Sequence, residues 1–176
     1  MKPIEGYNKL RGGYYTPEKI AEFIVDWAIR TTTDTILEPS CGDGSFVNAI
    51  TSKLQQMGTS DQAIKRNVTG VELDKTEAQK ASRYGASIIQ SDFFTYYQNC
   101  IDDKEKFDVI VGNPPFIRYQ NFEEEYRKIA FELMSKHGFH PNRLTNIWLP
   151  FLVLACKALK PDGRVGMVIP AELFQV

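Results

Sequence analysis

Short apolar segments alternate with longer amphipathic segments along most of the chain. The apolar segments are rich in aliphatic and β-branched residues and cover residues 35–40, 67–73, 86–93, 107–112 and 164–170. Apolar residues at helical spacing fall in residues 16–30, 46–57, 74–84, 123–136 and 143–159. Because parallel strands need long crossover connections, this alternation predicts an α/β fold with a doubly wound, mainly parallel sheet and helices on both faces.

Polar residues and prolines set the expected helix boundaries. Thr16 is placed to cap the first helix, with Pro17 in its first turn. Asp74 is placed to cap the helix over 74–84, and Glu77 stands at the spacing of a capping box. Pro150 falls inside the last helical segment, so we expect it to kink that helix.

Composition limits the class of protein. The 176 residues suit one domain, and a net charge of -1 gives no overall basic surface, so DNA binding would need a local patch or a further part. No signal peptide or membrane-length apolar run is visible, and the three cysteines form no CxxC pair, so we expect a cytoplasmic protein without a membrane partner. His137 and His140 are three apart, but no further ligand supports a metal there, and we expect none.

Polar or conformationally unusual residues follow four of the predicted strands. The sequences are EPSCGDGS, VELD, SDFF and NPPF, in chain order. The carboxyl ends of parallel strands meet at one edge of a sheet, and ligands bind there near the change in strand order. We therefore expect these four loops to form one site.

The CGDGS loop favours a positively charged ligand. Gly42 and Gly44 let the backbone turn tightly and approach a ligand closely. Val47 replaces the third glycine of a dinucleotide fingerprint, and Glu38 and Asp43 would repel a pyrophosphate. S-adenosylmethionine carries a sulfonium and an ammonium group, so it fits this loop better than NAD.

Two further acids end the second and third predicted strands. Glu72 can accept hydrogen bonds from both hydroxyls of a ribose, although a helix-capping role is the alternative. Asp92 can accept from an adenine amino group, and Phe93 can cover the ring. The alternative is that Asp92 is an acidic residue of the turn after the strand and that Phe93 is a core side chain.

The fourth strand ends in NPPF, which is unusual for a plain turn. Pro114 and Pro115 fix two φ angles and hold the chain extended. Asn113 can offer a side-chain carbonyl, and the backbone beside it a second carbonyl, to an exocyclic amine, which makes that nitrogen more nucleophilic. Phe116 can stack on the base. The alternative is a rigid turn with a core phenylalanine.

Together these motifs resemble those of the amino-type DNA methyltransferases. GGYYTP (12–17), LEPSCGDGSF (37–46), GVELD (70–74), SDFF (91–94) and GNPPF (112–116) occur in the order and approximate spacing of that family. The early Tyr-Thr-Pro segment resembles the gamma subgroup, which modifies adenine N6, and GNPPFIRYQ is similar to methylases of restriction–modification systems. The resemblance implies a class I, Rossmann-like S-adenosylmethionine-dependent methyltransferase that transfers a methyl group to adenine N6.

The resemblance also implies roles for single residues. Those expected to bind S-adenosylmethionine are Tyr15, Thr16, Pro17, Glu38, Cys41, Gly42, Gly44, Glu72, Leu73, Asp92, Phe93 and Asn113. Those expected to hold the target base and support catalysis are Asn113, Pro114, Pro115 and Phe116.

The implied partner is double-stranded DNA, from which the target adenine must leave the stack. Members of the family carry further strands and a target-recognition domain after the catalytic core. The chain ends in AELFQV directly after the fifth predicted strand, so we expect residues 1–176 to be an N-terminal catalytic fragment that lacks this domain. Contacts to the DNA backbone could come from Lys9, Arg11, Arg118 and Tyr119, although a solvated surface is the alternative.

Two other interpretations stay open on the sequence. Methyltransferases of ribosomal RNA bases or of a protein glutamine use similar NPPF-type chemistry, although GGYYTP argues against them. A non-catalytic assembly or DNA-binding subunit could keep the same fold, although the intact pocket residues argue against that.

Overall fold

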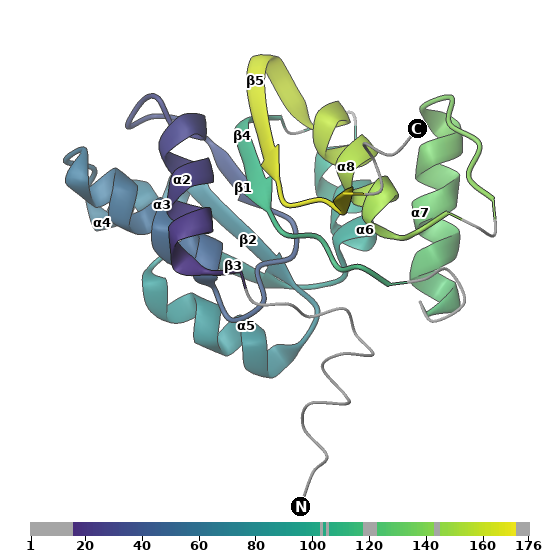
Figure 1. The fold of residues 1–176 in the computed structure, drawn as a ribbon, viewed down its shortest axis with the longest axis horizontal. Coiled ribbons are helices and arrows are strands. Elements are labelled where there is room, and N and C mark those ends of the chain that lie inside the picture. The colour runs from purple at the N-terminus through teal and green to yellow at the C-terminus, as the bar shows by residue number, and fades with distance from the viewer. Residues whose placement is uncertain (1–15, 103, 105, 118–122, 143–144, 172–176) are drawn as a thin grey trace, which may run out of the picture.

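A five-stranded parallel sheet forms the centre of the computed structural model, which describes residues 16–102, 104, 106–117, 123–142 and 145–171. The strands are β1 (Ile36–Glu38), β2 (Val68–Glu72), β3 (Ser87–Gln90), β4 (Phe107–Gly112) and β5 (Leu159–Met167). Their order is β3-β2-β1-β4-β5 (Figure 1). The predicted doubly wound, parallel α/β fold is therefore confirmed.

Helices cover both faces of this sheet (Figure 1). One face carries α2 (Glu18–Ala28), α3 (Ser45–Gln56) and α5 (Lys75–Ala81), and the other carries α6 (Phe93–Tyr96), α7 (Glu124–Lys136) and α8 (Trp148–Lys157). Successive residues of β1 divide between two hydrophobic clusters, because Ile36 packs on the first face and Leu37 on the second. Both side chains are fully buried, which explains why the strands are continuously apolar.

The strand order determines where a ligand can enter the sheet. From β1 the chain builds outward through β2 to β3, with its connecting helices on the first face. It then returns to the other side of β1 and builds outward through β4 to β5, with its helices on the second face. The switch point therefore lies between the carboxyl ends of β1 and β4, which are neighbours in the sheet.

The helix caps differ in part from those predicted. Thr16 does not cap α2, because the N-cap residue is Pro17 and no side chain caps this end, while Thr16 itself is buried. Asp74 does cap α5 and accepts two backbone N–H bonds of its first turn, at 2.7 and 3.1 Å. The predicted capping box is wrong, since Glu77 accepts a hydrogen bond from Lys80 (2.8 Å).

The last predicted helix begins five residues late. α8 starts at Trp148, so Pro150 stands in the first turn, where its missing N–H breaks no helical hydrogen bond. The predicted kink is therefore wrong. The sequence interpretation also missed two short helices, α6 and α4 (Asp61–Asn67), the second of which is capped by Ser60.

β5 begins earlier than predicted because a bulge follows its first residue. Its pairing with β4 shifts register between Phe107 and Val109, and Asp162 adopts a positive φ of 64° inside the extra loop.

None of the helices among the described residues has the length and apolar composition that a bilayer crossing requires.

Candidate functional site

Hydrogen bonds join the four polar loops at the carboxyl edge of the sheet. The Ser40 hydroxyl in the loop after β1 donates to the main-chain carbonyl of Asn113 after β4 (3.4 Å). The backbone N–H of Gly42 donates to Glu72 Oε2 at the end of β2 (2.8 Å), and the Ser91 N–H after β3 donates to the Glu72 carbonyl (3.0 Å). These contacts show that the four loops meet at one edge of the sheet; that they form one ligand site stays a prediction.

The glycine loop depends on backbone conformations that other residues adopt at a cost. Gly42 and Gly44 have positive φ angles of 52° and 98°, and Gly44 is the N-cap residue of α3. A Cβ on Gly44 would lie 2.9 Å from Ala81 Cα and 2.8 Å from the Tyr84 ring. Gly44 therefore permits both the turn and the close approach of α5, which fixes the loop beside β2.

Glu72 spans two loops with its carboxylate. Oε2 accepts from Gly42 N, and Oε1 accepts from Asp74 N at 2.7 Å. Burial raises the pKa of Glu72, while these two backbone hydrogen bonds lower it, and the net shift is upward. Each carboxylate oxygen has a second lone pair, so Glu72 can hold the glycine loop and still accept from a ligand hydroxyl.

Glu38 is a buried carboxyl group that forms no ion pair with any described residue. Only 1% of the residue is exposed, and Oε2 has no hydrogen-bond partner among the described residues. Burial raises its pKa well above the ordinary value, and the nearby charges of Glu72 and Asp43 raise it further. A buried polar atom without a hydrogen-bond partner is uncommon in folded proteins.

Cys41 contributes its backbone, rather than its thiol, to the loop. Its side chain is buried in the core and lies against the Gly70 backbone, since a Cβ on Gly70 would be 3.1 Å from the sulfur. Its N–H donates to the Val71 carbonyl of β2 (2.9 Å). Burial raises the pKa of the thiol and the nearby charge of Glu38 raises it further, which disfavours the reactive thiolate form.

Asp92 and Phe93 lie largely inside the protein. Asp92 is buried and caps α6 by accepting from the Thr95 N–H at 2.9 Å, and burial raises its pKa. The Phe93 ring is 2% exposed and stacks on Phe151 with centroids 5.0 Å apart. The ring is thus a core side chain, as the alternative interpretation of the sequence had it, and the expectation that it covers a ligand ring is not met in this structure.

The NPPF segment leaves β4 at the switch point. Asn113, Pro115 and Phe116 are half-buried, and Pro114 is buried. Gly112 permits this exit, because a Cβ there would lie 3.2 Å from Glu38 Oε1. The Asn113 corner and the buried Glu38 carboxyl group are therefore adjacent.

The remaining predicted residues are placed only in part. Thr16 is buried and Pro17 exposed at the start of α2, and Leu73 is 42% exposed beside Glu72. Tyr15 lies outside the described residues, as do Lys9, Arg11, Arg118 and Tyr119. Ser40 was not predicted as a site residue, although its position inside EPSCGDGS was a usable signal.

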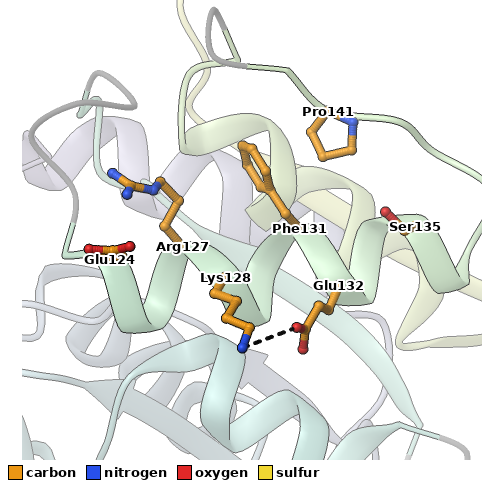
Figure 2. A pocket seen from close by; sticks show the side chains of 7 residues that line it. All are labelled: Glu124, Arg127, Lys128, Phe131, Glu132, Ser135 and Pro141. Atoms are coloured by element: carbon orange, nitrogen blue, oxygen red, sulfur yellow. Dashed lines mark ion pairs between the residues drawn. The ribbon is translucent and has the colours of Figure 1, made fainter.

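A separate hollow is lined mainly by residues of α7 (Figure 2). Its volume is about 540 Å³, and its lining includes Arg127, Phe131 and Pro141, with a Lys128–Glu132 ion pair of 3.9 Å beside them. No residue predicted for cofactor or base binding lines it. Among the described residues, no group of three or more His, Cys, Asp or Glu side chains could hold a metal ion.

Comparison with known families gives this arrangement a context. The model of the N-6 DNA methylase family matches residues 4–175. This chain belongs to that family. The matched residues include the glycine loop and the NPPF corner described above, and the family is the one that the motifs resemble.

The N-6 DNA methylase relatives are longer than this chain. Type II methyltransferase M.HincII of Haemophilus influenzae is 28% identical over 163 residues, which are 93% of this chain and 28% of the relative. Type II methyltransferase M.CvrRI of Paramecium bursaria Chlorella virus XZ-6E is 33% identical over 167 residues, 93% of this chain and 37% of the relative. The chain therefore spans well under half the length of these relatives.

Solved structures agree on the fold of this N-6 DNA methylase chain. A class I S-adenosylmethionine-dependent methyltransferase from Listeria monocytogenes, titled putative, superposes with a TM-score of 0.68 at 17% identity, over 94% of this chain and 49% of the other. The DrdV–DNA complex gives a TM-score of 0.73 at 19% identity, over 98% and 22%. The fold is therefore that of the class I methyltransferases.

Proposed function

We propose that this chain is the catalytic core of a DNA adenine-N6 methyltransferase that uses S-adenosylmethionine. Family membership and the type II methyltransferase relatives support the reaction class. The observation that carries the proposal is the contact between Ser40 and the Asn113 carbonyl, because it joins the cofactor-type glycine loop to the corner that would hold the base.

The side chains at the carboxyl edge of the sheet are suited to binding S-adenosylmethionine. Glu38, Glu72 and Asp43 gather around the glycine loop, which favours a cation over a pyrophosphate. Glu72 has lone pairs for ribose hydroxyls, and the exposed apolar side chain of Leu73 beside it could cover a flat ring. S-adenosylmethionine would supply an electrophilic methyl group on sulfur to an attacking nitrogen.

The protein's own residues would prepare the nucleophile. An exocyclic amine on an aromatic base is a weak nucleophile because its lone pair is delocalised into the ring. Acceptors at the Asn113 corner would bind both N–H bonds, and the stiff Pro114–Pro115 backbone would keep them in place before the base arrives. The nitrogen held at this corner would take the methyl group that the cofactor's sulfonium supplies, and the methylated nitrogen would then lose its proton to water, so no strong base would be needed.

Labelled substrates test the proposal. The full-length protein that contains this chain is incubated with methyl-labelled S-adenosylmethionine and, separately, with duplex DNA, ribosomal RNA and a protein mixture. We expect label in DNA alone, recovered as N6-methyladenine after digestion. Label in RNA or protein would move the assignment to another substrate class, and no transfer despite cofactor binding would favour a non-catalytic subunit.

A further inference from the structure

The Ser40 hydroxyl continues the contact between β1 and β4 beyond the point where their backbone pairing ends. The last residues that pair are Leu37 and Ile110, which are 73 positions apart in the sequence. Ser40 and Asn113 are also 73 positions apart, so they occupy corresponding positions after two neighbouring strands. Pro39, which precedes Ser40, has no backbone N–H to donate. A side-chain donor therefore joins the two loops where this backbone donor is missing.

The loop that contains Ser40 is anchored on its other side to β2. The N–H of Cys41 donates to the Val71 carbonyl (2.9 Å), and the N–H of Gly42 donates to Glu72 Oε2 (2.8 Å). Three consecutive residues thus bind the two strands that flank β1 in the sheet. Because the loop spans the switch point in this way, Ser40 links the position of the glycine loop to the end of β4.

The backbone of Asn113 lies between two restrained points. On one side, Gly112 packs against the loop after β1, since a Cβ there would lie 3.4 Å from Pro39 Cδ, and its carbonyl accepts from the Val168 N–H (3.0 Å). On the other side, the ring of Pro114 fixes its own φ angle and restricts Asn113 to extended conformations. A hydrogen bond to the carbonyl of Asn113 therefore acts on a peptide group that has few other orientations.

We propose that Ser40 is a positioning residue for methyl transfer, whose hydroxyl orients the Asn113 peptide so that the Asn113 side chain faces the target amine. The proposal rests on the proposed function, because it takes an adenine amino group as the methyl acceptor. In this role Ser40 contacts neither the base nor the methyl donor, and it acts only through Asn113. Its removal should therefore slow the transfer and leave cofactor binding nearly unchanged.

The length of the hydrogen bond sets the size of the expected effect. At 3.4 Å it is longer than the usual O–H···O distance of about 2.5–3.0 Å, so its contribution in the free protein is small. Hydrogen bonds at catalytic sites are often long in the free enzyme and shorten in the reacting complex. We therefore expect Ser40 to contribute mainly once the base is bound, by no more than one neutral hydrogen bond.

Methyl-transfer rates test the hydroxyl directly. The full-length protein and its Ser40→Ala and Ser40→Thr variants react in single turnovers with labelled S-adenosylmethionine and a duplex oligonucleotide that carries the sequence found methylated in DNA. We expect Ser40→Ala to lower the rate by about 3- to 10-fold, the range of one neutral hydrogen bond. Ser40→Thr keeps a hydroxyl and should stay within about twofold of wild type. A loss of rate in both variants, or in neither, would overturn the proposal.

A binding measurement separates positioning from damage to the fold. The same duplex is prepared with purine in place of the target adenine, which removes only the 6-amino group, and both duplexes are titrated into the protein with S-adenosylhomocysteine bound. We expect Ser40→Ala to bind the adenine duplex about threefold or more weakly and the purine duplex within about twofold of wild type. Differences in base pairing cancel, because both proteins bind the same two duplexes. Equal weakening of both would mean that Ser40 only supports the fold, and would overturn the proposal.

Ser82→Ala is the matched control. The Ser82 hydroxyl also donates to a main-chain carbonyl, that of Gln79 (2.8 Å), but Ser82 is exposed and the two residues are only three positions apart. We expect this variant to behave as wild type in every measurement, and a loss equal to that of Ser40→Ala would contradict the proposal.

Cofactor affinity shows whether the glycine loop of the variant is intact. We expect Ser40→Ala to bind S-adenosylhomocysteine within about twofold of wild type, and a larger loss would overturn the proposal, since Ser40 would then act on the cofactor. If the wild type transfers no methyl group to DNA, the proposed function fails. If the wild type does so and Ser40→Ala matches it, this inference alone fails.

Discussion

Asn113 and Glu72 differ in what a single side chain contributes to the candidate site. Glu72 holds the glycine loop through two backbone N–H groups, so it has a structural role before any ligand arrives. Asn113 is half-buried at the switch point, where its own main-chain carbonyl accepts a hydrogen bond from the Ser40 hydroxyl. Substitution of Glu72 should therefore weaken cofactor binding, and substitution of Asn113 should slow the chemical step.

Asn113→Ala should abolish methyl transfer while leaving cofactor binding nearly intact. On the proposed function the change removes the side-chain acceptor for the target amine, so kcat should fall at least about 100-fold. Single-turnover methylation and calorimetric titration on the full-length protein measure the two quantities. A parallel loss of both would contradict the role assigned to Asn113.

Glu72→Ala should weaken S-adenosylmethionine binding by about 1.5–3 kcal/mol, the usual range for charge-assisted hydrogen bonds. Glu72→Gln is the matched variant, because its one carbonyl oxygen can still accept from either Gly42 or a ribose hydroxyl. We expect Gln to lose less affinity than Ala in the same titration. If neither variant changes the affinity, Glu72 does not contact the cofactor.

At the scale of elements, the approach of α5 to the start of α3 sets the shape of the glycine loop. Ala81 and Tyr84 lie so close to Gly44 that a side chain at this position would collide with them. Asp74 caps α5 and its own N–H binds Glu72, so the helix, its cap and the acid form one connected unit. The glycines allow the loop to adopt its backbone conformation. The packing of α5 against the start of α3 then determines which conformation the loop has.

Gly44→Ala should lower the free energy of unfolding more than Gly58→Ala does. Both glycines have positive φ, 98° and 87°, so both substitutions cost about 1–2 kcal/mol of backbone strain. A Cβ on Gly58 meets nothing within 4 Å, whereas one on Gly44 meets the Ala81 backbone at 2.9 Å. The difference between the two variants in urea unfolding measures the cost of the contact with Ala81. An equal loss of unfolding free energy in both would mean that α5 can shift without cost.

At the scale of the whole molecule, two polar clusters tie β5 to the first half of the chain. Arg164 binds Asp34 at 3.0 Å, and Lys160 binds Asp108 at 2.8 Å, while Asp108 also accepts from the N–H and hydroxyl of Thr35. These contacts join residues up to 130 positions apart in the sequence. They hold the bulged strand in register at the amino end of the sheet, opposite the site.

Asp108→Asn should reduce stability at neutral pH and make the protein less sensitive to acid. Partial burial alone would raise the pKa of Asp108, but hydrogen bonds from Lys160 and Thr35 lower it overall. A depressed pKa means that the carboxylate stabilises the fold above its unfolded pKa of about 3.9, and that this is lost as pH falls through the lower folded value. Urea unfolding from pH 7 to pH 3 should show the two proteins converging; a constant difference would exclude Asp108 ionisation as the cause.

The sequence by itself determined the sheet, its parallel strands and the four loops of the candidate site. Parallel strands buried on both faces must be apolar, whereas the residues that follow them can be polar. Both patterns can be seen within a few consecutive residues of the sequence. The bounds of β4, for example, were predicted without error. Tertiary structure alone decided that Thr16 is no cap, that Pro150 starts a helix and that the Phe93 ring enters the core. It also buried Glu38 beside Glu72 and Asp43 with no ion pair to a described residue, because burial and neighbouring charges depend on contacts between segments that lie far apart in the chain.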